Sequence, residues 1–593
     1  MLACVAAALV ASSSVQIWIA DESEKVLPDA TPRRAKEPAR IRFSAAGGEC
    51  IGAQIVVRSE KGVKALSASA QPLVSAEERA LPATGGGRRP EHPTARVSLD
   101  VMRVATILLA RPTEPEGRAG EWPDALIPVR DPLFGQTRRA FPIDVGAGRA
   151  QAIFVEACPA RGLSGTRGAR FSSTIQLGWI DDSSGAKLAG ARVPVELKMR
   201  GFDLPATPAL VTAFGFSGYS AAKGHKRGPE ANPELTRAYD TIALRRGITL
   251  FGGTQNTPPY QAHGDEVKID WKVYDDEVAP FLEGTALPDG ARWTSVELRE
   301  PKTLTRGQRR SWRRAWMSHF QERGWLDRLF AYVEDEPAAK DFARVEQHAR
   351  ELREDAPSIR RLVTTAWSDQ LPSIDVWVPL LNCLGEGSPN CPRPVARSRY
   401  RDAEAKGAWV WWYQSCMSHG CDPSGVVLPQ HRAAFTGWPD YVIDAPATAA
   451  RAMGALAFAN GIAGELYYDV VYSYDFSDPW ELQYGFGGNG DGNLYYPGTP
   501  ARIGGDRDVP VETLRIVQIQ RGIQDYEYLA LCSKMGDAKL AGEEARSLAP
   551  AIRRFSRDPK AYASMRDRIG ARIEVLNAER RKGSGEKVGL GGR

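Results

Sequence analysis

The sequence predicts a multidomain protein in which an N-terminal all-β sandwich is followed by a (β/α)8 TIM barrel with a C-terminal helical extension. Two observations support this prediction. The chain of 593 residues is too long for one hydrophobic core, because single cores stop growing near about 250 to 300 residues. The hydrophobic pattern also changes from short alternating runs before residue 200 to strand-like runs separated by helix-length stretches after residue 208, which indicates parallel βα units in the second part.

The chain opens with an apolar run of signal-peptide length, so we expect a signal peptide over residues 1–16 and a secreted or periplasmic protein. Because the basic segment that normally precedes such a run is missing, two alternatives stay open: a misplaced start site, and a buried or disordered N-terminus. Cys4 is faintly similar to the lipid-bearing cysteine of a lipoprotein signal, but it precedes most of the apolar run. Export would permit disulfides within two closely spaced pairs, Cys383 with Cys391 and Cys416 with Cys421.

Residues 17–200 are expected to form the β-sandwich. Segments such as residues 53–58, 97–101 and 193–197 alternate apolar and polar side chains and are separated by glycine, proline and aspartate. This pattern is typical of short antiparallel strands. Two prolines then mark residues 201–208 as a linker, because proline interrupts regular structure.

Residues 209–535 are expected to form the barrel. Eight strand candidates lie at residues 210–216, 248–251, 293–298, 329–333, 361–366, 376–381, 409–413 and 465–471. The clearest helices lie at residues 233–246, 306–322, 338–354, 447–460 and 511–532. Strands that alternate with helices in this way are typical of a (β/α)8 barrel with inserted loops.

Beyond the barrel, residues 536–580 are expected to add a helical extension, mainly over residues 543–577. The tail at residues 581–593 is rich in glycine and lysine and is expected to be disordered.

The composition favours a glycan as the partner. Fifteen Trp and eighteen Tyr are present, and flat aromatic faces pack against sugar rings while polar ring edges stay in water. The net charge of +5 arises from 77 basic and 72 acidic residues that are mixed along the chain, so no nucleic-acid partner is expected. No segment is apolar over the length of a transmembrane helix, and nothing indicates the oligomeric state.

No cofactor and no metal ion are expected. The glycine-rich residues 487–493 lack the Lys-Ser/Thr pair of a P-loop and the distal glutamate of an EF-hand. The Gly-x-Ser-x-Gly and His-Glu-x-x-His motifs do not occur in the sequence. Cys416, His419 and Cys421 could supply metal ligands, but no second cluster has zinc-like spacing.

The strongest candidates for catalysis follow the fourth predicted barrel strand, since active sites of such barrels lie at the C-terminal ends of the strands. An apolar run ends there in Glu334, Asp335 and Glu336, and Pro337 follows. Adjacent carboxylates repel one another, which favours a protonated carboxyl that could act as a general acid. An alternative is an acidic loop that caps the next helix, because negative charge stabilises a helix N-terminus.

Aromatic and polar residues at the exits of strands seven and eight are expected to bind the substrate. Strand seven ends in three such residues, and strand eight is followed by a long loop that contains further aromatic residues and a Gly-Asp-Gly sequence. The candidates are Trp412, Tyr413, Gln414, Tyr468, Asp469, Trp480 and Asp491.

Several motifs occur in an order that resembles a known family. They are Tyr-Val-Glu-Asp-Glu-Pro at residues 332–337, Trp-Trp-Tyr at 411–413, Gly-Asp-Gly-Asn-Leu-Tyr-Tyr-Pro-Gly at 490–498, Arg-Gly-Ile-Gln-Asp-Tyr-Glu-Tyr-Leu at 521–529, and two N-terminal segments at 17–26 and 122–128. On these motifs the chain resembles glycoside hydrolase family 123 and the related bacterial domain of unknown function 4091.

The resemblance implies a β-sandwich followed by a barrel and exo-acting cleavage of β-linked N-acetylgalactosamine by substrate-assisted retention. In that reaction the 2-acetamido oxygen of the substrate attacks the anomeric carbon. By position, Glu336 would protonate the leaving oxygen and Asp335 would hold the acetamido N–H, while aromatic residues of strands seven and eight would line the acetamido pocket.

Two other functions stay open at this point. One is a glycosidase that acts on sugars without an acetamido group and pairs Glu336 with a distant carboxylate nucleophile such as Asp469. The other is a non-catalytic carbohydrate-binding protein in which the aromatic residues bind glycans and the acidic residues are structural.

Overall fold

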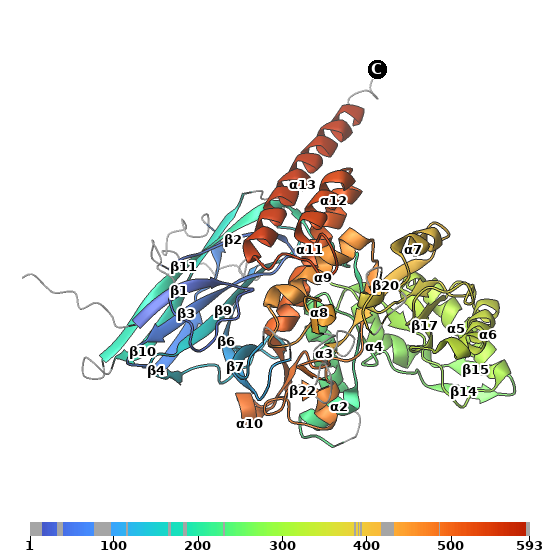
Figure 1. The fold of residues 1–593 in the computed structure, drawn as a ribbon, viewed down its shortest axis with the longest axis horizontal. Helices are drawn as coiled ribbons and strands as arrows, with labels where there is room; N and C mark the ends of the chain where they lie inside the picture. Colours follow the sequence, from blue (N-terminus) through green and yellow to red (C-terminus); the bar gives the residue numbers. More distant parts are fainter. Residues whose placement is uncertain are drawn as a thin grey trace, which may run out of the picture.

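The computed structural model describes residues 15–32, 39–75, 97–113, 117–163, 168–181, 187–228, 232–384, 387–389, 391, 394–416, 432–485 and 487–588. In Figure 1 the blue strands of a β-sandwich lie at one side of the molecule, green and yellow elements of a barrel lie at the other, and red C-terminal helices lie above their junction. Residues 1–14 of the expected signal peptide fall outside the described residues. Within the described part, no helix is both long and apolar enough to cross a bilayer.

The N-terminal part consists of two facing sheets, as predicted. The first contains, in spatial order, β1 (Val15–Asp21), β3 (Ile51–Ser59), β9 (Ala150–Pro159), β6 (Val97–Leu109) and β7 (Gly120–Pro128). The second contains β2 (Ile41–Gly47), β11 (Lys187–Asp203), β10 (Arg170–Asp181), β4 (Val63–Ala70) and β8 (Ile143–Val145), with β5 (Val74–Ser75) paired to β10.

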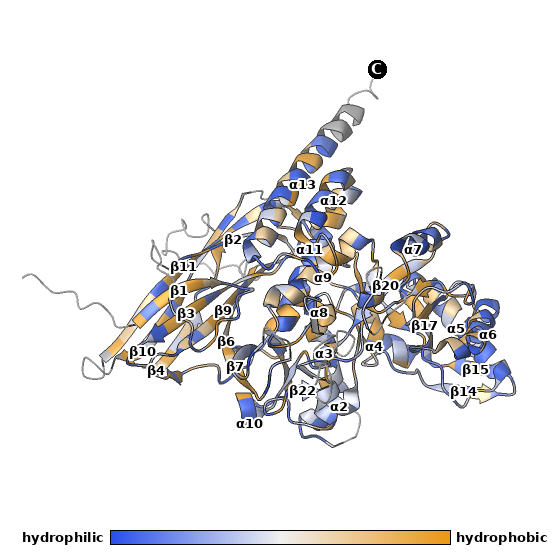
Figure 2. Cartoon of the chain, viewed as in Figure 1, coloured by the Kyte–Doolittle hydropathy of each residue, from blue (hydrophilic) through white to orange (hydrophobic). Residues whose placement is uncertain are grey.

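The alternating sequence pattern produces the sandwich core. Ile55 and Val155 of the first sheet and Val193 and Val195 of the second are buried in one hydrophobic cluster. The strands of the sandwich carry both hydrophobic and hydrophilic residues in Figure 2. Along β11 the buried Val193, Val195, Leu197 and Met199 occur at every second position, as expected for a strand that presents one face to a core and one to solvent. β11 continues to Asp203, so the expected linker at residues 201–208 begins inside a strand.

Two strands from the second half of the chain also belong to the sandwich. β25 (Val509–Thr513) pairs antiparallel with β7, and β24 (Tyr496–Gly498) pairs with β25. The first sheet therefore has seven strands. A boundary between sandwich and barrel cannot be drawn at one position of the chain, because β24 and β25 return to the sandwich after the barrel strands.

The barrel sheet has eight parallel strands, and each overlaps a predicted strand. They are β12 (Val211–Gly215), β13 (Leu250–Phe251), β16 (Val296–Glu297), β17 (Leu329–Glu334), β18 (Arg360–Val363), β19 (Val376–Trp377), β20 (Trp409–Gln414) and β21 (Gly464–Tyr467). Neighbours in the sheet follow chain order, and β21 pairs with β12. β13 and β16 stand at the two ends of this order without pairing to each other, although all residues between them are described. The sheet is thus a nearly closed parallel barrel.

A side chain bridges the open seam. Gln255 is 1% exposed, and its Nε2 donates to the carbonyls of Leu250 at 3.0 Å and Ser295 at 3.2 Å. Its Oε1 accepts from the backbone N–H of Glu297 at 3.2 Å. One amide therefore satisfies main-chain groups on both edges that a strand ladder would otherwise pair.

The helical layer departs from a regular (β/α)8 pattern. Two helices follow β12, namely α2 (Gly218–Gly224) and α3 (Pro233–Arg245), and a hairpin of β14 (Tyr260–His263) and β15 (Glu266–Ile269) precedes α4 (Trp271–Glu283). One helix follows each of β16, β17 and β19: these are α5 (Arg306–Glu322), α6 (Phe342–Asp355) and α7 (Arg397–Glu404). Two helices follow β20, namely α8 (Arg432–Phe435) and α9 (Ala447–Asn460). All residues between β18 and β19 are described and none is helical. The prediction of a complete (β/α)8 barrel is corrected here, because this segment is too short for a helix and two returns.

The C-terminal extension is helical, with bounds that differ from those predicted. α11 (Leu514–Lys534) is followed by α12 (Ala538–Leu548) and α13 (Pro559–Val588), and α13 projects from the body of the molecule (Figure 1). The single helix expected at residues 543–577 is divided by a turn that contains Pro550. The tail expected to be disordered from residue 581 is helical to Val588.

A buried ionic network joins the two halves. Arg246, which caps α3, contacts Glu156 of β9 at 2.8 Å and Glu512 of β25 at 2.5 Å. Arg521 of α11 contacts Glu156 at 2.5 Å and Glu22 at 2.9 Å. Burial alone would raise the pKa of Glu156, but the two guanidinium groups lower it to about 2. The motif around Arg521 thus fastens the sandwich to the barrel.

Two disulfides are present among the described residues. Cys383 bonds to Cys391, which confirms the pairing suggested by their spacing. Cys50 bonds to Cys158 across a sequence separation of 108 residues, which the sequence did not indicate. Cys416 is disulfide-bonded as well, while Cys421 and the potential metal ligand His419 lie outside the described residues.

Candidate active site

The exit of β17 positions Asp335 and Glu336. Phe330 and Tyr332 pack toward the barrel interior, and the two acidic residues follow at the C-terminal edge with exposed side chains. Glu336 has a φ of 42°, a left-handed conformation that costs a non-glycine residue about 1–3 kcal/mol and often occurs at functional sites.

Asp335 is bound to two neighbouring strands. Its Oδ1 accepts hydrogen bonds from the Tyr332 hydroxyl at 2.7 Å and from the Thr364 hydroxyl at 2.9 Å. Tyr332 belongs to β17, and Thr364 follows β18 and is 2% exposed. These two donors fix the orientation of the carboxylate at the barrel mouth.

Glu336 is held from two other directions. Its backbone N–H donates to Thr364 Oγ1 at 2.7 Å, and its Oε1 accepts from the hydroxyl of Tyr413 on β20. Burial and then the Glu336 carboxylate raise the pKa of Tyr413 above its usual range. The Tyr413 hydroxyl therefore stays protonated and acts as a donor to Glu336.

Glu334 is directed elsewhere. Arg344 of α6 donates to its Oε2 at 2.6 Å. The three consecutive acidic residues therefore do not share one site: Glu334 forms a surface ion pair, while Asp335 and Glu336 bind different hydroxyl groups.

Of the three candidates on strand seven, Tyr413 is the one that contacts Glu336. Trp411 and Tyr413 belong to the cluster inside the barrel, and side chains alternate between the two faces of a strand. Trp412 and Gln414 are fully buried on the opposite face. Among the described residues, no hydrogen-bond partner is found for either amide atom of Gln414.

Tyr468 and Asp469 follow β21. The Tyr468 ring lies 5.2 Å from that of Tyr467 and 5.9 Å from that of Tyr472, measured between centroids. The Oδ1 of Asp469 accepts from the backbone N–H of Val471 at 2.6 Å, and burial raises the pKa of Asp469 to about 7. Both residues follow the strand that pairs with β20 and therefore stand at the C-terminal edge of the barrel.

Asp491 connects the exits of strands seven and eight. It is 2% exposed, and it accepts from the backbone N–H of Cys416 at 3.0 Å and from the Tyr467 hydroxyl at 3.1 Å. Burial raises its pKa to about 7. The flanking Gly490 and Gly492 have φ values of 82° and 67°, which suit glycine. The buried Gly-Asp-Gly motif therefore stabilises the barrel mouth by binding the segments at the ends of β20 and β21.

Trp480 lies against the sandwich side. Its Nε1 donates to the carbonyl of Pro497 at 3.0 Å, and its ring is 4.7 Å from that of Tyr496. It packs against the cluster that contains β24 and β25, so the structure does not bring it together with Asp335 and Glu336.

Sequence reasoning missed Thr364 and an ion pair on the strand before β17. Glu297 and Arg299 at the exit of β16 lie 2.8 Å apart, and burial raises the pKa of Glu297. Alternation within the fifth predicted strand could have identified Thr364, because Leu362 packs inside the barrel and residue 364 shares its face.

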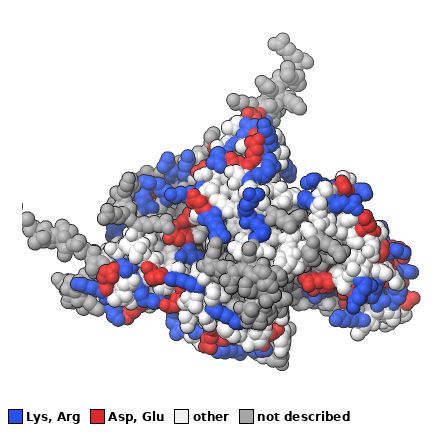
Figure 3. Space-filling view, viewed as in Figure 1, with Lys and Arg blue, Asp and Glu red and all other residues white. Residues whose placement is uncertain are grey.

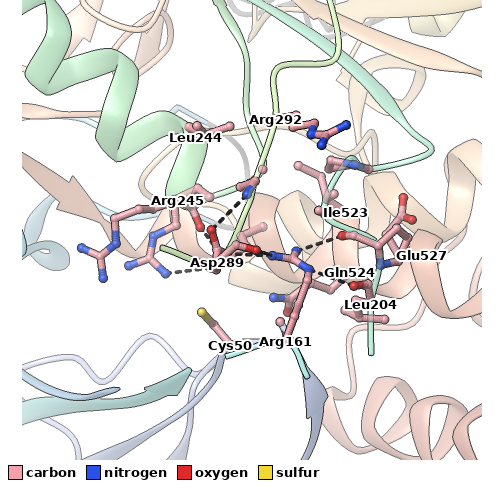
Figure 4. A pocket seen from close by; sticks show the side chains of 18 residues that line it. Cys50, Arg161, Leu204, Leu244, Arg245, Asp289, Arg292, Ile523, Gln524 and Glu527 are labelled. Carbon is pink, nitrogen blue, oxygen red and sulfur yellow. Dashed lines mark hydrogen bonds and ion pairs between the residues drawn. The ribbon is translucent and has the colours of Figure 1, made fainter. Parts of the chain in front are cut away.

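A separate pocket lies at the opposite end of the barrel, between its base and the sandwich (Figure 4). Arg161 reaches into it and donates to the carbonyls of Leu204 and Pro205 at 2.9 Å each, and to Asp289. Glu527 there accepts from the backbone N–H of Ala209 at 2.6 Å. These side chains bind the main chain between the two halves, which indicates a structural role.

Residues 310–532 match the family description "Glycoside hydrolase 123, catalytic domain". Among solved structures, a family 123 glycoside hydrolase from Clostridium perfringens is similar over 96% of this chain and 99% of that chain, with 11% identity and a TM-score of 0.61. A mutant of Bacteroides uniformis β-glucuronidase 2 covers 82% of this chain and 48% of its own, with 12% identity and a TM-score of 0.25. No protein with a curated description matches the chain.

The likeness to the Clostridium perfringens enzyme shows a shared fold across both halves of the chain. The matched segment includes Asp335, Glu336, Thr364, Tyr413 and Asp491. The match supports glycosidase activity, and residues 310–532 are similar to the catalytic domain of glycoside hydrolase family 123.

Proposed function

We propose that the protein is an exo-acting glycoside hydrolase that removes a β-linked N-acetylhexosamine, with N-acetylgalactosamine favoured, and retains the anomeric configuration by substrate-assisted catalysis. The observation that supports this most is the separate binding of two adjacent carboxylates. Asp335 accepts from Tyr332 and Thr364, whereas Glu336 accepts from Tyr413. Two neighbouring acids with different partners can take different roles.

In this mechanism Glu336 transfers its proton to the glycosidic oxygen as the bond to the anomeric carbon breaks. The acetamido oxygen of the substrate forms the new bond to that carbon, and Asp335 accepts the acetamido N–H and stabilises the positive charge of the ring that forms. Water then opens this ring, and the Glu336 carboxylate accepts a proton from that water molecule. The Tyr413 hydroxyl stabilises the Glu336 carboxylate between the two steps.

The alternative with Asp469 as a covalent nucleophile is weakened by the environment of that residue. Burial raises the pKa of Asp469 to about 7, and its Oδ1 is bound to the main chain at Val471. A nucleophilic carboxylate should be ionised and free to approach the anomeric carbon. This environment favours a role for Asp469 in binding the substrate.

Turnover of nitrophenyl N-acetyl-β-galactosaminide and its glucosaminide and plain galactoside analogues tests the proposal. We expect cleavage of the acetamido sugars with retention, inhibition by an N-acetyl thiazoline, and large losses of kcat in Glu336→Gln and Asp335→Asn. Cleavage of the plain galactoside with a covalent sugar trapped on Asp469 would support the alternative. Glycan binding without any turnover would exclude both enzymatic proposals.

We also propose that the protein is exported. The apolar N-terminus suggests this, and the described disulfides Cys50–Cys158 and Cys383–Cys391 support it, because structural disulfides persist in oxidising compartments. Fractionation of expressing cells, followed by thiol labelling with and without reductant, tests it. Recovery of reduced protein from the cytoplasm would contradict it.

A further inference from the structure

One hydroxyl contacts both candidate catalytic residues. Thr364 Oγ1 donates to Asp335 Oδ1 at 2.9 Å and accepts from the backbone N–H of Glu336 at 2.7 Å. We propose that Thr364 is a positioning residue that sets the placement of Asp335 and Glu336 relative to each other, and thereby the rate of the chemical step. This inference rests on the proposed function.

Hydrogen-bond capacity explains why a hydroxyl is needed here. A threonine hydroxyl has one proton and two acceptor sites, so it can serve Asp335 as a donor and the Glu336 N–H as an acceptor at once. The Tyr332 hydroxyl lies 2.7 Å from Asp335 Oδ1 and 3.2 Å from Thr364 Oγ1, and its single proton goes to the nearer carboxylate. Oδ1 is then occupied by two donors. No donor among the described residues contacts Oδ2, which is left for a substrate N–H.

The main chain gives a second reason. The ladder between β17 and β18 shifts register between Tyr332 and Glu334, and such bulges re-aim side chains next to active sites. Backbone pairing of the two strands ends at Glu334 and Val363. After these residues, the Thr364 hydroxyl makes the next hydrogen bond between the two strand exits, to the backbone N–H of Glu336. This hydrogen bond holds Glu336 in its conformation with a φ of 42°.

The first test compares wild type, Thr364→Val and Thr364→Ser on a nitrophenyl N-acetyl-β-hexosaminide. Valine keeps the shape and removes the hydroxyl, so we expect kcat to fall about 10²-fold, the effect of misplacing reacting groups by about 1 Å, with a smaller change in KM. Serine keeps the hydroxyl and should retain kcat within about threefold of wild type.

A double-mutant cycle separates positioning from general stability. If Thr364 acts through Asp335, Thr364→Val should cost little further kcat in the Asp335→Ala background, which removes the oxygen that accepts from Thr364. Thr294→Val is the matched control, because Thr294 is a buried barrel threonine whose Oγ1 accepts from the backbone N–H of Thr212 at 2.9 Å, outside the site. It should lower thermal stability and leave kcat unchanged.

The outcomes distinguish the two proposals. An active wild type with an equally active Thr364→Val, or fully additive losses in the cycle, would overturn the positioning role alone. Absence of wild-type turnover on every β-glycoside would overturn the proposed function and this inference with it. If Thr364→Val does not fold, Thr364→Ala removes the same hydroxyl without adding a methyl group and is measured in the same way.

Discussion

Two hydrogen bonds hold Glu336 in place. Its backbone N–H donates to Thr364, which follows β18, and its carboxylate accepts from Tyr413 on β20. The raised pKa of Tyr413 keeps that phenol neutral, so it donates to the carboxylate that remains after Glu336 has released its proton. A donor of this kind stabilises the charged form of its partner. At the scale of residues, the site therefore depends on hydroxyl groups of Tyr332, Thr364 and Tyr413 as well as on the two carboxylates.

Tyr413→Phe should lower kcat/KM by about 10- to 100-fold, since a hydrogen bond to a charged group contributes about 1.5–3 kcal/mol. The measurement is kcat/KM from pH 4 to 8 on a nitrophenyl N-acetyl-β-hexosaminide. Tyr562→Phe is the control, because the Tyr562 hydroxyl donates to Ser556 at 2.9 Å on the C-terminal extension. Equal activity of Tyr413→Phe and wild type would exclude a role for this hydrogen bond.

At the scale of elements, the loop after β21 is shaped by close packing. A Cβ on Gly492 would lie 2.2 Å from the Tyr468 hydroxyl, and one on Gly215 would lie 1.9 Å from the Tyr468 carbonyl. The exits of β12 and β21 and the Gly-Asp-Gly loop therefore approach one another at distances that only glycine permits. This packing fixes where Tyr468 and Asp469 stand at the mouth.

Gly492→Ala should lose stability and activity together, because the methyl group displaces Tyr468 and the residue has a φ of 67°. Gly324→Ala is a matched control with a φ of 69° and open space around the added Cβ. Both should lose about 1 kcal/mol from the backbone conformation, as measured by urea unfolding. Only Gly492→Ala should lose activity, and equal activity in both variants would contradict the packing argument.

At the scale of the whole molecule, β24 and β25 return from the barrel half to the sandwich, and a buried ionic network joins the two parts. We therefore expect the sandwich and the barrel to unfold together. On the face drawn in Figure 3, basic and acidic side chains are interspersed, and most surface pairs of this kind contribute little. The buried contacts of Glu156 with Arg246 and Arg521 differ, because removal of one partner leaves a buried charge uncompensated.

Stability should be greatest near about pH 4 and fall on both sides of that pH. The folded pKa of Glu156 is about 2, below the unfolded value of about 4.3. Its contribution is therefore complete above the unfolded pKa and lost as the pH falls toward 2. Burial raises the folded pKa of Asp240 to about 7, above the unfolded value of about 3.9. Its contribution is therefore complete below about pH 4 and is lost as the pH rises from about 4 to 7.

Two substitutions distinguish the loss of stability at acidic pH from the loss at higher pH, as measured by urea unfolding between pH 3 and pH 9. Glu156→Gln should destabilise the protein by about 3–5 kcal/mol at pH 7 and flatten the acidic limb. Asp240→Asn should make the limb between about pH 4 and pH 7 less steep, because it removes one of the groups with a raised pKa. The asparagine oxygen can still accept from the Thr254 N–H, now 2.9 Å from the carboxylate. Parallel curves for both variants and wild type would show that other groups control the pH dependence.

The barrel strands could be predicted because each is a local apolar run with its own length and ends. The position of Asp335 and Glu336 at the exit of β17 could be predicted because the apolar run of that strand ends directly before the acidic residues. The missing helix after β18 and the open seam at Gln255 could not, because they depend on how many residues are available to return across the sheet and on how its two edges meet.

The sequence by itself determined the order of the elements, the acidic pair at the end of strand four and the resemblance to family 123, because these are properties of contiguous residues. Only the tertiary structure determined which side chains and strands contact these elements and acidic residues. It brought Thr364 to Asp335, Tyr413 to Glu336, β25 to the sandwich and Cys50 to Cys158. These partners are distant in the chain, and they are selected by packing of the complete fold, which no local pattern of residues records.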